Sequence, residues 1–289
     1  MMKLRTLLFA PADSERKCTK ALASSADGVI LDLEDSVAAN AKVEARMAAS
    51  AFLAAAPDRS RAIVRINPRD TDWYLGDLAA IAPRAPAAIL LPKCTGPADL
   101  AALDHHLEAL EAVSGLTVGS IGILALVTET AASLRDMAYA GVTPRLRALL
   151  FGAEDLAADF GIAPRSADGA MTAPVLAARA ALLIAAAQAQ VPAIDTPWPD
   201  PRDPDGLARE LAAAARDGFA GKLCIHPDQL AAVTDAFTPT PERVRWAEAV
   251  RDLFAERPAS GVLVLDGKMV DRPHLRLAER ILASAAEAP

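Results

Sequence analysis

Four charged side chains in this sequence stand in or at the end of short apolar runs, and their types could bind a metal ion and an anionic substrate. The run LDLED ends at Asp35, IVRIN contains Arg65, ILALVTE ends at Glu129 and ALLFGAED ends at Asp155. Apolar runs of this length are typical of parallel strands buried on both faces. The carboxyl ends of such strands meet at one rim that opens to ligands, so we predict that these charges assemble a site there.

Glu129 and Asp155 are the candidate metal ligands. They follow the fifth and sixth predicted strands, so we expect them to be neighbours on the rim. Two carboxylates, completed by oxygens from substrate and water, suit magnesium, and no cluster of His or Cys in the sequence offers a zinc site. The alternative is that each residue only caps the segment that follows it.

Arg65 interrupts an apolar strand, where a guanidinium without a partner would be costly. Its planar group could bind a substrate carboxylate or a developing enolate oxygen. The alternative is a structural ion pair with Asp32, Glu34 or Asp35. Strand alternation predicts Asp32 and Glu34 on one face and Asp35 on the other. Glu34 could hold metal-bound water from outside the ligand shell.

Two further residues that could suggest chemistry have simpler interpretations. Lys93 ends the fourth strand and is expected to pair with a rim carboxylate rather than to form a Schiff base. His226 ends the eighth strand, where a role in satisfying backbone groups is favoured over a role in the site. The sequence has no nucleophile elbow and no phosphate-binding glycine loop.

Strand-like runs alternate with alanine-rich helical segments along most of the chain. We predict strands at 5–11, 28–34, 62–67, 87–93, 120–129, 148–152, 193–197 and 221–227, and helices around 14–25, 41–56, 72–82, 97–113, 130–140, 171–190, 205–217 and 228–236. Such alternation predicts right-handed strand–helix–strand units and a parallel sheet. Eight units close most naturally as a TIM (β/α)8 barrel, over residues 1–238. An open doubly wound sheet would favour a glycine-rich turn after the first strand, and FAPADSER is not one.

Residues 239–289 do not continue the alternation of strands and helices. TPTPERVRWAEAVRDLFAER predicts an amphipathic helix that Thr240 caps and Pro241 begins. GVLVLDGKMVD predicts a hairpin that turns at Asp266-Gly267, and a final helix follows. This extension is too short for a core of its own, so it should pack on a barrel.

The composition excludes several classes of function. The net charge is −7 and the basic residues are dispersed, which argues against binding of nucleic acid or an anionic membrane. No run is long and apolar enough for a membrane span, and the amino terminus does not read as a signal sequence. The three cysteines share no metal-ligand spacing, so we expect buried thiols in a cytoplasmic protein.

Taken together, the motifs resemble those of the citrate lyase beta-subunit family of coenzyme A ester lyases. The matching stretches are RTLLFAP, DGVILDLEDSV, RINP, LLPK, TET, FGAEDLAADFG, GFAGKLCIHPDQ, TPERVRWA and DGKMVDRP, which span nearly the whole chain. The resemblance implies a Mg²⁺-dependent barrel, with Mn²⁺ as a possible substitute, that forms a homotrimer or hexamer. It also implies that residues 239–289 form a lid over the site of a neighbouring subunit.

The resemblance assigns roles to individual residues. It implies that Glu129 and Asp155 bind the metal, that Arg65 binds substrate and that Asp271 is the catalytic acid or base. Coenzyme A would lie near the first strand and loop, at Phe9, Arg16 and Lys20. One departure is that Ala12 follows Pro11 where the family often has glycine, and this could alter the loop over the coenzyme.

These features predict cleavage of a 3-hydroxyacyl-coenzyme A, such as citramalyl- or malyl-coenzyme A, to acetyl- or propionyl-coenzyme A and a 2-keto acid. Retention of GKMVD argues for a stand-alone enzyme acting on free acyl-coenzyme A. Three alternatives stay open at this point. They are a citrate lyase beta subunit that needs an acyl-carrier partner, a class II aldolase of free 2-keto acids, and a non-catalytic binding protein on the same scaffold.

Overall fold

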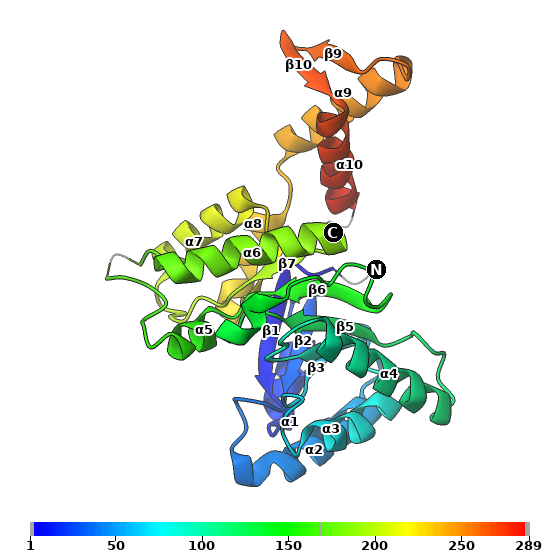
Figure 1. The fold of residues 1–289 in the computed structure, drawn as a ribbon, viewed down its shortest axis with the longest axis vertical. Coiled ribbons are helices and arrows are strands. Elements are labelled where there is room, and N and C mark those ends of the chain that lie inside the picture. The colour runs from blue at the N-terminus through cyan, green and yellow to red at the C-terminus, as the bar shows by residue number, and fades with distance from the viewer. Residues whose placement is uncertain (1–2, 168, 287–289) are drawn as a thin grey trace. The chain divides into compact units, whose positions relative to one another are not determined.

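Eight short parallel strands, each followed by a helical segment, close into a barrel in the computed structural model (Figure 1). The structure describes residues 3–167 and 169–286. The strands are β1 (Thr6–Pro11), β2 (Gly28–Asp32), β3 (Ala62–Arg65), β4 (Ala88–Leu91), β5 (Gly122–Leu126), β6 (Leu146–Leu150), β7 (Ala193–Asp195) and β8 (Gly221–Cys224). They pair in chain order and the barrel closes between β8 and β1. The predicted TIM (β/α)8 barrel is confirmed.

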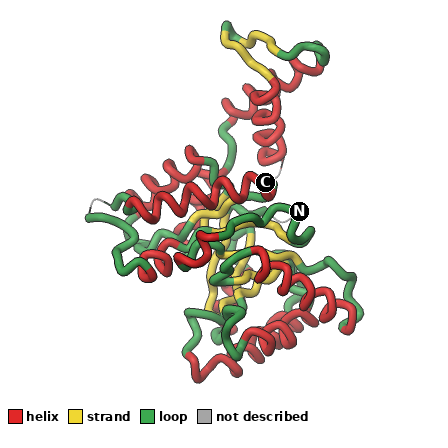
Figure 2. Tube along the Cα trace, viewed as in Figure 1, coloured by secondary structure: helices red, strands yellow, loops and turns green. Residues whose placement is uncertain are grey.

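Helices surround these strands (Figure 2). The α-helices are α1 (Glu15–Leu22), α2 (Lys42–Ala55), α3 (Tyr74–Ile81), α4 (Pro97–Val113), α5 (Ala153–Asp159), α6 (Ala173–Ala189), α7 (Pro204–Asp217) and α8 (Leu230–Phe237). Short 3-10 helices lie between them at η1 (Ala39–Ala41), η2 (Ala82–Arg84), η3 (Ala131–Arg135) and η4 (Pro227–Gln229).

Both faces of the strands are buried, which explains why they read as uninterrupted apolar runs. Alternate residues such as Leu7, Ile30, Ile63 and Leu223 pack together in one core cluster. The residues between them are buried as well. Burial on both faces is the usual condition of a parallel sheet covered by helices.

The helix prediction contains two errors, and both concern the rim. The segment 130–140 contains only the 3-10 helix η3, because side chains take the backbone groups that a longer helix would use. Ser133 Oγ donates to the Thr130 carbonyl and Asp136 Oδ1 accepts from the Ala138 N–H. No helix was predicted directly after the sixth strand, but the structure has α5 there, which buries Leu156.

The chain divides into two compact units, one ending at Val233 and the other beginning at Thr234. The second unit contains α9 (Pro241–Glu256), β9 (Val262–Leu265), β10 (Lys268–Asp271) and α10 (Arg272–Ala286). It has a small core of its own, contrary to the prediction, in which Ala247, Val250, Phe254, Leu263, Val270, Ala278 and Ile281 cluster.

The predicted hairpin in this unit is confirmed. β9 and β10 pair antiparallel. Asp266 and Gly267 have φ values of 49° and 74°, the left-handed pair that a two-residue type I′ turn requires. The Thr240 hydroxyl accepts from the Arg243 N–H and caps α9, as predicted.

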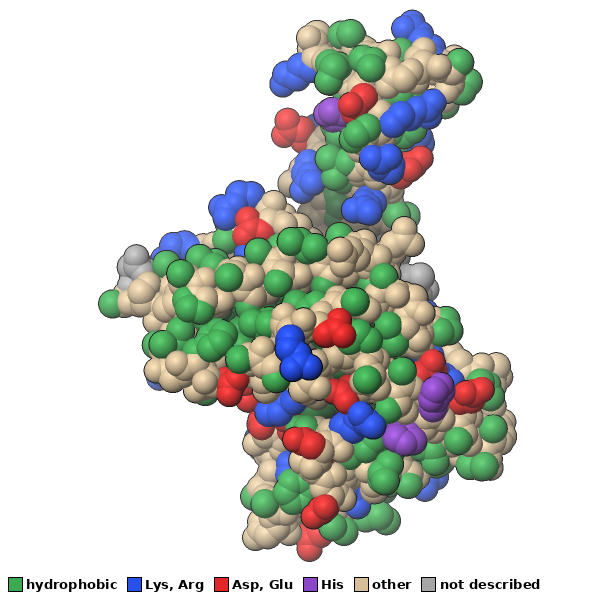
Figure 3. Space-filling model, viewed as in Figure 1, with side chains coloured by type: hydrophobic (Ala, Val, Ile, Leu, Met, Phe, Trp, Pro, Cys, Tyr) green, Lys and Arg blue, Asp and Glu red, His purple; other side chains and the backbone are tan. Residues whose placement is uncertain are grey.

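Three findings concern the expectations drawn from composition, namely the membrane spans, the surface charge and the cysteines. Within the described ranges no helix combines the length and the apolar character that crossing a bilayer requires. Acidic and basic side chains are interspersed on the face that Figure 3 shows. All three cysteines are buried free thiols, as predicted.

Candidate active site

A cavity of about 450 Å³ opens at the carboxyl ends of the barrel strands. The final residues of β1, β2, β3 and β5, which are Pro11, Asp32, Arg65 and Leu126, all contribute to its wall. The other lining residues are Phe9, Asp35, Ser36, Glu129, Phe151, Gly152, Ala153, Glu154, Asp155, Thr196, Pro197, Leu223 and Ile225. Strand ends therefore position a site where the sequence predicted one.

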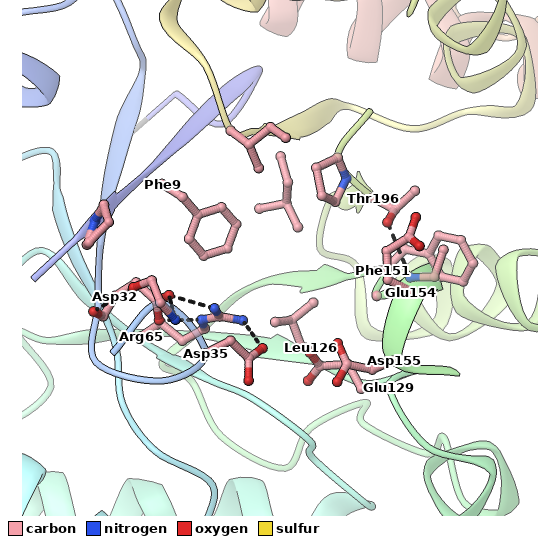
Figure 4. Close-up of a pocket in the computed structure, with 17 residues that line it drawn as sticks. Phe9, Asp32, Asp35, Arg65, Leu126, Glu129, Phe151, Glu154, Asp155 and Thr196 are labelled. Carbon is pink, nitrogen blue, oxygen red and sulfur yellow. Dashed lines mark hydrogen bonds and ion pairs between the residues drawn. The ribbon is translucent and has the colours of Figure 1, made fainter. Parts of the chain in front are cut away.

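Arg65 lies between carboxylates on one side of this cavity (Figure 4). Its Nε and Nη2 each donate to Asp32 over 2.7 Å, and Nη1 lies 2.9 Å from Glu34 Oε2. The Phe9 ring covers the guanidinium at 4.8 Å. Burial alone would lower the pKa of Arg65, but the hydrogen bonds with Asp32 raise it. The structural ion pair is thus present, and Arg65 faces the cavity as well.

Asp35 corrects the face prediction for LDLED. It was expected to point away from Asp32 and Glu34, yet it lines the cavity and its Oδ2 lies 3.5 Å from Arg65 Nη1. The alternation fails because β2 ends at Asp32. The Asp32 carboxylate accepts the N–H groups of Glu34 and Ser36 and so turns the chain back toward the cavity.

Glu129 lies just beyond β5 and is almost fully buried. Its Oε2 accepts the backbone N–H of Lys93, and Gly152 makes room for it, because a Cβ there would come within 2.5 Å of Glu129 Cγ. Burial and the charge of Glu34 raise the pKa of Glu129 to about 8, against the lowering effect of Lys93. A positive charge beside this carboxylate would therefore be strongly favoured.

Asp155 belongs to the first turn of α5 rather than to the end of β6. It is nevertheless brought to the same cavity as Glu129. The Lys93 ammonium lies 3.4 Å from Asp155 Oδ1. Two carboxylates that the sequence placed after adjacent strands thus line one cavity, although Asp155 is carried there by a helix.

Lys93 pairs with rim carboxylates, as predicted. Its ammonium contacts Glu34 Oε1 and reaches Asp35 Oδ1 at 3.8 Å. Glu34 consequently bridges Lys93 and Arg65, and burial raises the pKa of Glu34 despite Arg65. Glu34 Oε2 is buried and pairs with Arg65 Nη1 at 2.9 Å, although none of the described residues donates a well-aligned hydrogen bond to it.

Lys42 is a positioning residue to which the sequence analysis assigned no role. Its buried ammonium donates to the carbonyl groups of Leu33 at 2.8 Å and Glu34 at 2.6 Å, and lies over the Trp73 ring. These bonds fix the turn that carries Asp32, Glu34 and Asp35. A lysine eight residues after such an acidic turn, opening a helix, was the available signal.

Of the remaining site candidates, only Phe9 lines the cavity. Phe9 reaches the cavity, but Arg16 and Lys20 lie on the exposed face of α1 and do not line it. Asp271 belongs to the second unit, where its Oδ1 lies 2.6 Å from His274 Nδ1, and that hydrogen bond lowers the pKa of Asp271. His226 Nδ1 accepts the Asp228 N–H, so its backbone-capping role is confirmed.

The rim residues fit a hard divalent cation. Glu129 and Asp155 line the cavity, and carboxylate oxygens are the ligands that a hard divalent cation prefers. Across the described ranges, no three His, Cys, Asp or Glu side chains form a complete ligand set. A cation held here would thus keep positions open for substrate oxygens.

The family model that matches residues 5–227 is HpcH/HpaI aldolase/citrate lyase. This chain belongs to that family of aldolases and lyases. The predicted family and enzyme class are therefore confirmed.

Individual relatives cover nearly the whole chain. A (3S)-malyl-CoA thioesterase of Cereibacter sphaeroides is 36% identical, over 97% of this chain and 94% of its own. The mitochondrial citramalyl-CoA lyase of Rattus norvegicus is 34% identical, over 97% of this chain and 86% of its own. The structure resembles that of CitE from Mycobacterium tuberculosis in complex with magnesium, acetoacetate and coenzyme A. The TM-score is 0.78 with 34% identity, covering 99% of both chains.

Proposed function

We propose that this protein is a Mg²⁺-dependent lyase that cleaves a 3-hydroxyacyl-coenzyme A to an acyl-coenzyme A and a 2-keto acid. Citramalyl-coenzyme A, yielding acetyl-coenzyme A and pyruvate, is the leading substrate. Malyl-coenzyme A and its methyl homologue, which would yield propionyl-coenzyme A, follow. The observation that carries this proposal is the cavity in which Glu129 and Asp155 face the guanidinium of Arg65.

The metal would be held by Glu129 and Asp155, with Glu34 holding water beside it. Bound there, magnesium would supply Lewis-acid polarisation of the substrate hydroxyl and of the keto group that forms from it. The relative crystallised with magnesium, acetoacetate and coenzyme A supports this assignment. The surplus of carboxylates around the cavity supports it from this chain's own residues.

Arg65 would bind the anionic end of the substrate and stabilise the charge that develops when the carbon–carbon bond breaks. Because Asp32 and Phe9 already fix its guanidinium, little reorganisation is needed when the substrate arrives. The apolar part of the cavity wall, including Leu126 and Phe151, would exclude water from the thioester. Arg16 and Lys20 stay our candidates for the phosphates of coenzyme A.

Asp271 would protonate the thioester enolate in cleavage and remove the same proton in condensation. Its lowered pKa makes it a carboxylate at neutral pH, which suits proton removal. In the cleavage direction, the proton that the substrate hydroxyl gives up would balance the proton that Asp271 delivers, and His274 lies 2.6 Å from Asp271 Oδ1 as its hydrogen-bond partner. We propose that the second unit supplies this residue to the site of a neighbouring subunit in a homo-oligomer, a trimer or hexamer.

The direct test is incubation of the protein with Mg²⁺ and a panel of citramalyl-, malyl- and methylmalyl-coenzyme A. The proposal expects release of a 2-keto acid together with an acyl-coenzyme A, and loss of the reaction when EDTA is added. If no thioester yields a keto acid, the lyase proposal is wrong.

A thioesterase is the second candidate, because the malyl-coenzyme A thioesterases match over nearly the whole chain. A thioesterase would release free coenzyme A and a hydroxy acid, so titration of thiol beside keto acid separates the two reactions. A citrate lyase beta subunit would act only on an acyl-carrier thioester. A class II aldolase would act on free 2-keto acids without coenzyme A.

A further inference from the structure

Lys93 combines an unusual backbone conformation with contacts to several rim carboxylates. Its φ of 47° lies in the left-handed region, which an unbranched L-residue adopts only when its surroundings hold it there. In this conformation the N–H bonds to Glu129 Oε2, while the ammonium contacts Glu34 and lies 3.4 Å from Asp155. One residue thus touches both proposed metal ligands.

Acidic side chains outnumber basic ones at the rim, so the position of Lys93 affects the charge balance there. Among the ion pairs of the described residues, Asp32, Glu34, Asp35 and Asp155 pair only with Arg65 and Lys93. Glu129 accepts the backbone N–H of Lys93, and the Lys42 ammonium behind the rim bonds to backbone carbonyl groups. Arg65 is held by its two bonds to Asp32. Lys93 has a side chain that is 30% exposed and a flexible stem, so it is the cation that can move.

We propose that Lys93 is a resident counter-ion that holds the rim carboxylates together until a divalent cation displaces it from Asp155. The inference rests on the metal site of the proposed function. An ammonium and a divalent cation on the same carboxylate repel each other, so Lys93 competes with the metal for Asp155. Its backbone bond to Glu129 does not depend on the ammonium, so that ligand stays in position during the exchange.

Lys93→Met removes the charge and keeps an unbranched side chain with the same backbone cost at positive φ. We expect it to bind Mn²⁺ about tenfold more tightly than the native protein, because one repulsive unit charge near the metal is lost. Free Mn²⁺ can be titrated by electron paramagnetic resonance. Lys93→Arg, which keeps the charge, and Lys17→Met, on the exposed face of α1, should bind Mn²⁺ as the native protein does.

Equal or weaker Mn²⁺ binding by a folded Lys93→Met would overturn the counter-ion role. Failure of the native protein to bind Mn²⁺ would instead remove the proposed metal site itself, and the inference with it. The two results are distinguishable in one titration series.

A second measurement uses the native protein alone. Reductive methylation with formaldehyde and cyanoborohydride, followed by peptide mass spectrometry, reports how accessible each lysine amine is. Saturating Mg²⁺ should accelerate labelling of Lys93 several-fold and leave Lys17 unchanged as the internal control. An unchanged or slower rate at Lys93 with Mg²⁺ would contradict displacement.

Discussion

Two regions of the barrel contain buried charged side chains, but their charges balance differently. At the cavity rim, the four carboxylates of Asp32, Glu34, Asp35 and Asp155 share the two cations Arg65 and Lys93, and Glu129 adds a fifth acidic side chain. On the outer side of β7 and β8, Lys222 is completely buried and pairs with Asp195 at 3.0 Å and with Glu210 at 2.6 Å. We call this second region the outer network.

In the outer network, acidic and basic side chains alternate along a chain of ion pairs. Arg179 joins Asp195 to Asp217, and Arg165 joins Glu210 to Glu154. Arg216 also pairs with Asp217, so four cations match four carboxylates, of which Glu154 is half-exposed. Such a network fixes strands to helices and leaves little net charge to attract a ligand.

One carboxylate from each region, Glu129 at the rim and Asp217 in the outer network, shows a pKa shift in the opposite direction to the other. Burial and Glu34 raise the pKa of Glu129 at the rim to about 8. In the outer network, burial would raise the pKa of Asp217, but its bond with Arg179 outweighs burial and lowers it. Residue type therefore does not separate a binding site from a structural network. Glu154 of the outer network also lines the cavity, so the separating feature is the surplus of negative charge at the rim.

The largest expected effect comes from neutralising one rim ligand. Glu129→Gln keeps the shape of the side chain and removes its charge, so we expect loss of Mn²⁺ binding and a fall in lyase turnover on the order of 10³-fold. Glu210→Gln removes a carboxylate from the outer network and should leave Mn²⁺ affinity unchanged. Equal Mn²⁺ affinity in both variants would show that the rim carboxylate is no more important for metal binding than one in the outer network.

Asp271→Asn should lower turnover by roughly 10²–10⁴-fold, because an amide cannot exchange the proton with the substrate carbon. Metal binding at the rim should not change, which a Mn²⁺ titration checks. The His274→Asn variant would sharpen the result, since loss of the partner should shift the pH profile of turnover. Near-normal turnover by Asp271→Asn would remove this residue as the acid.

Lys222→Met tests the outer network through stability. The change leaves Asp195 and Glu210 buried with one partner fewer, so the free energy of unfolding should fall by about 3–5 kcal/mol. Urea unfolding measures it, with Lys17→Met as an exposed control. Turnover per folded molecule should be retained, because the pair lies outside the cavity. A change below about 1 kcal/mol, the size expected of an exposed pair, would show that the network is not structural.

The smallest effect is the pH dependence of stability in metal-free buffer. The pKa of Glu129 is about 8 in the folded state and 4.5 in the unfolded reference. Folded molecules therefore hold the proton between these values, and stability falls as pH rises through that window. Asp217 acts oppositely, since its lowered pKa gives stability that is full above its reference of 3.8 and is lost in acid.

Urea unfolding at pH 5 and pH 8, with EDTA present, checks the contribution of Glu129. Glu129→Gln should lose less stability than the native protein across that interval, and Mg²⁺ should reduce the native loss. Parallel pH profiles for the native and variant proteins would contradict the raised pKa.

Local patterns alone were sufficient to predict the barrel and much of the rim. A strand buried on both faces must be apolar throughout, so Arg65 and Glu129 stand out as exceptions that need a partner or a ligand. The turn at Asp266-Gly267 was equally clear, because few residue pairs accept two left-handed conformations.

Other features were decided only by the tertiary structure, because they depend on where neighbouring segments end. Asp35 faces the cavity since β2 stops at Asp32, and Asp155 arrives on α5 rather than on a strand. The sharing of Lys93 among carboxylates from separate segments has no local signature. The sequence by itself determined which residue types line the rim. Their charge balance, and so their readiness for a cation, was settled by distances that only the closed barrel sets.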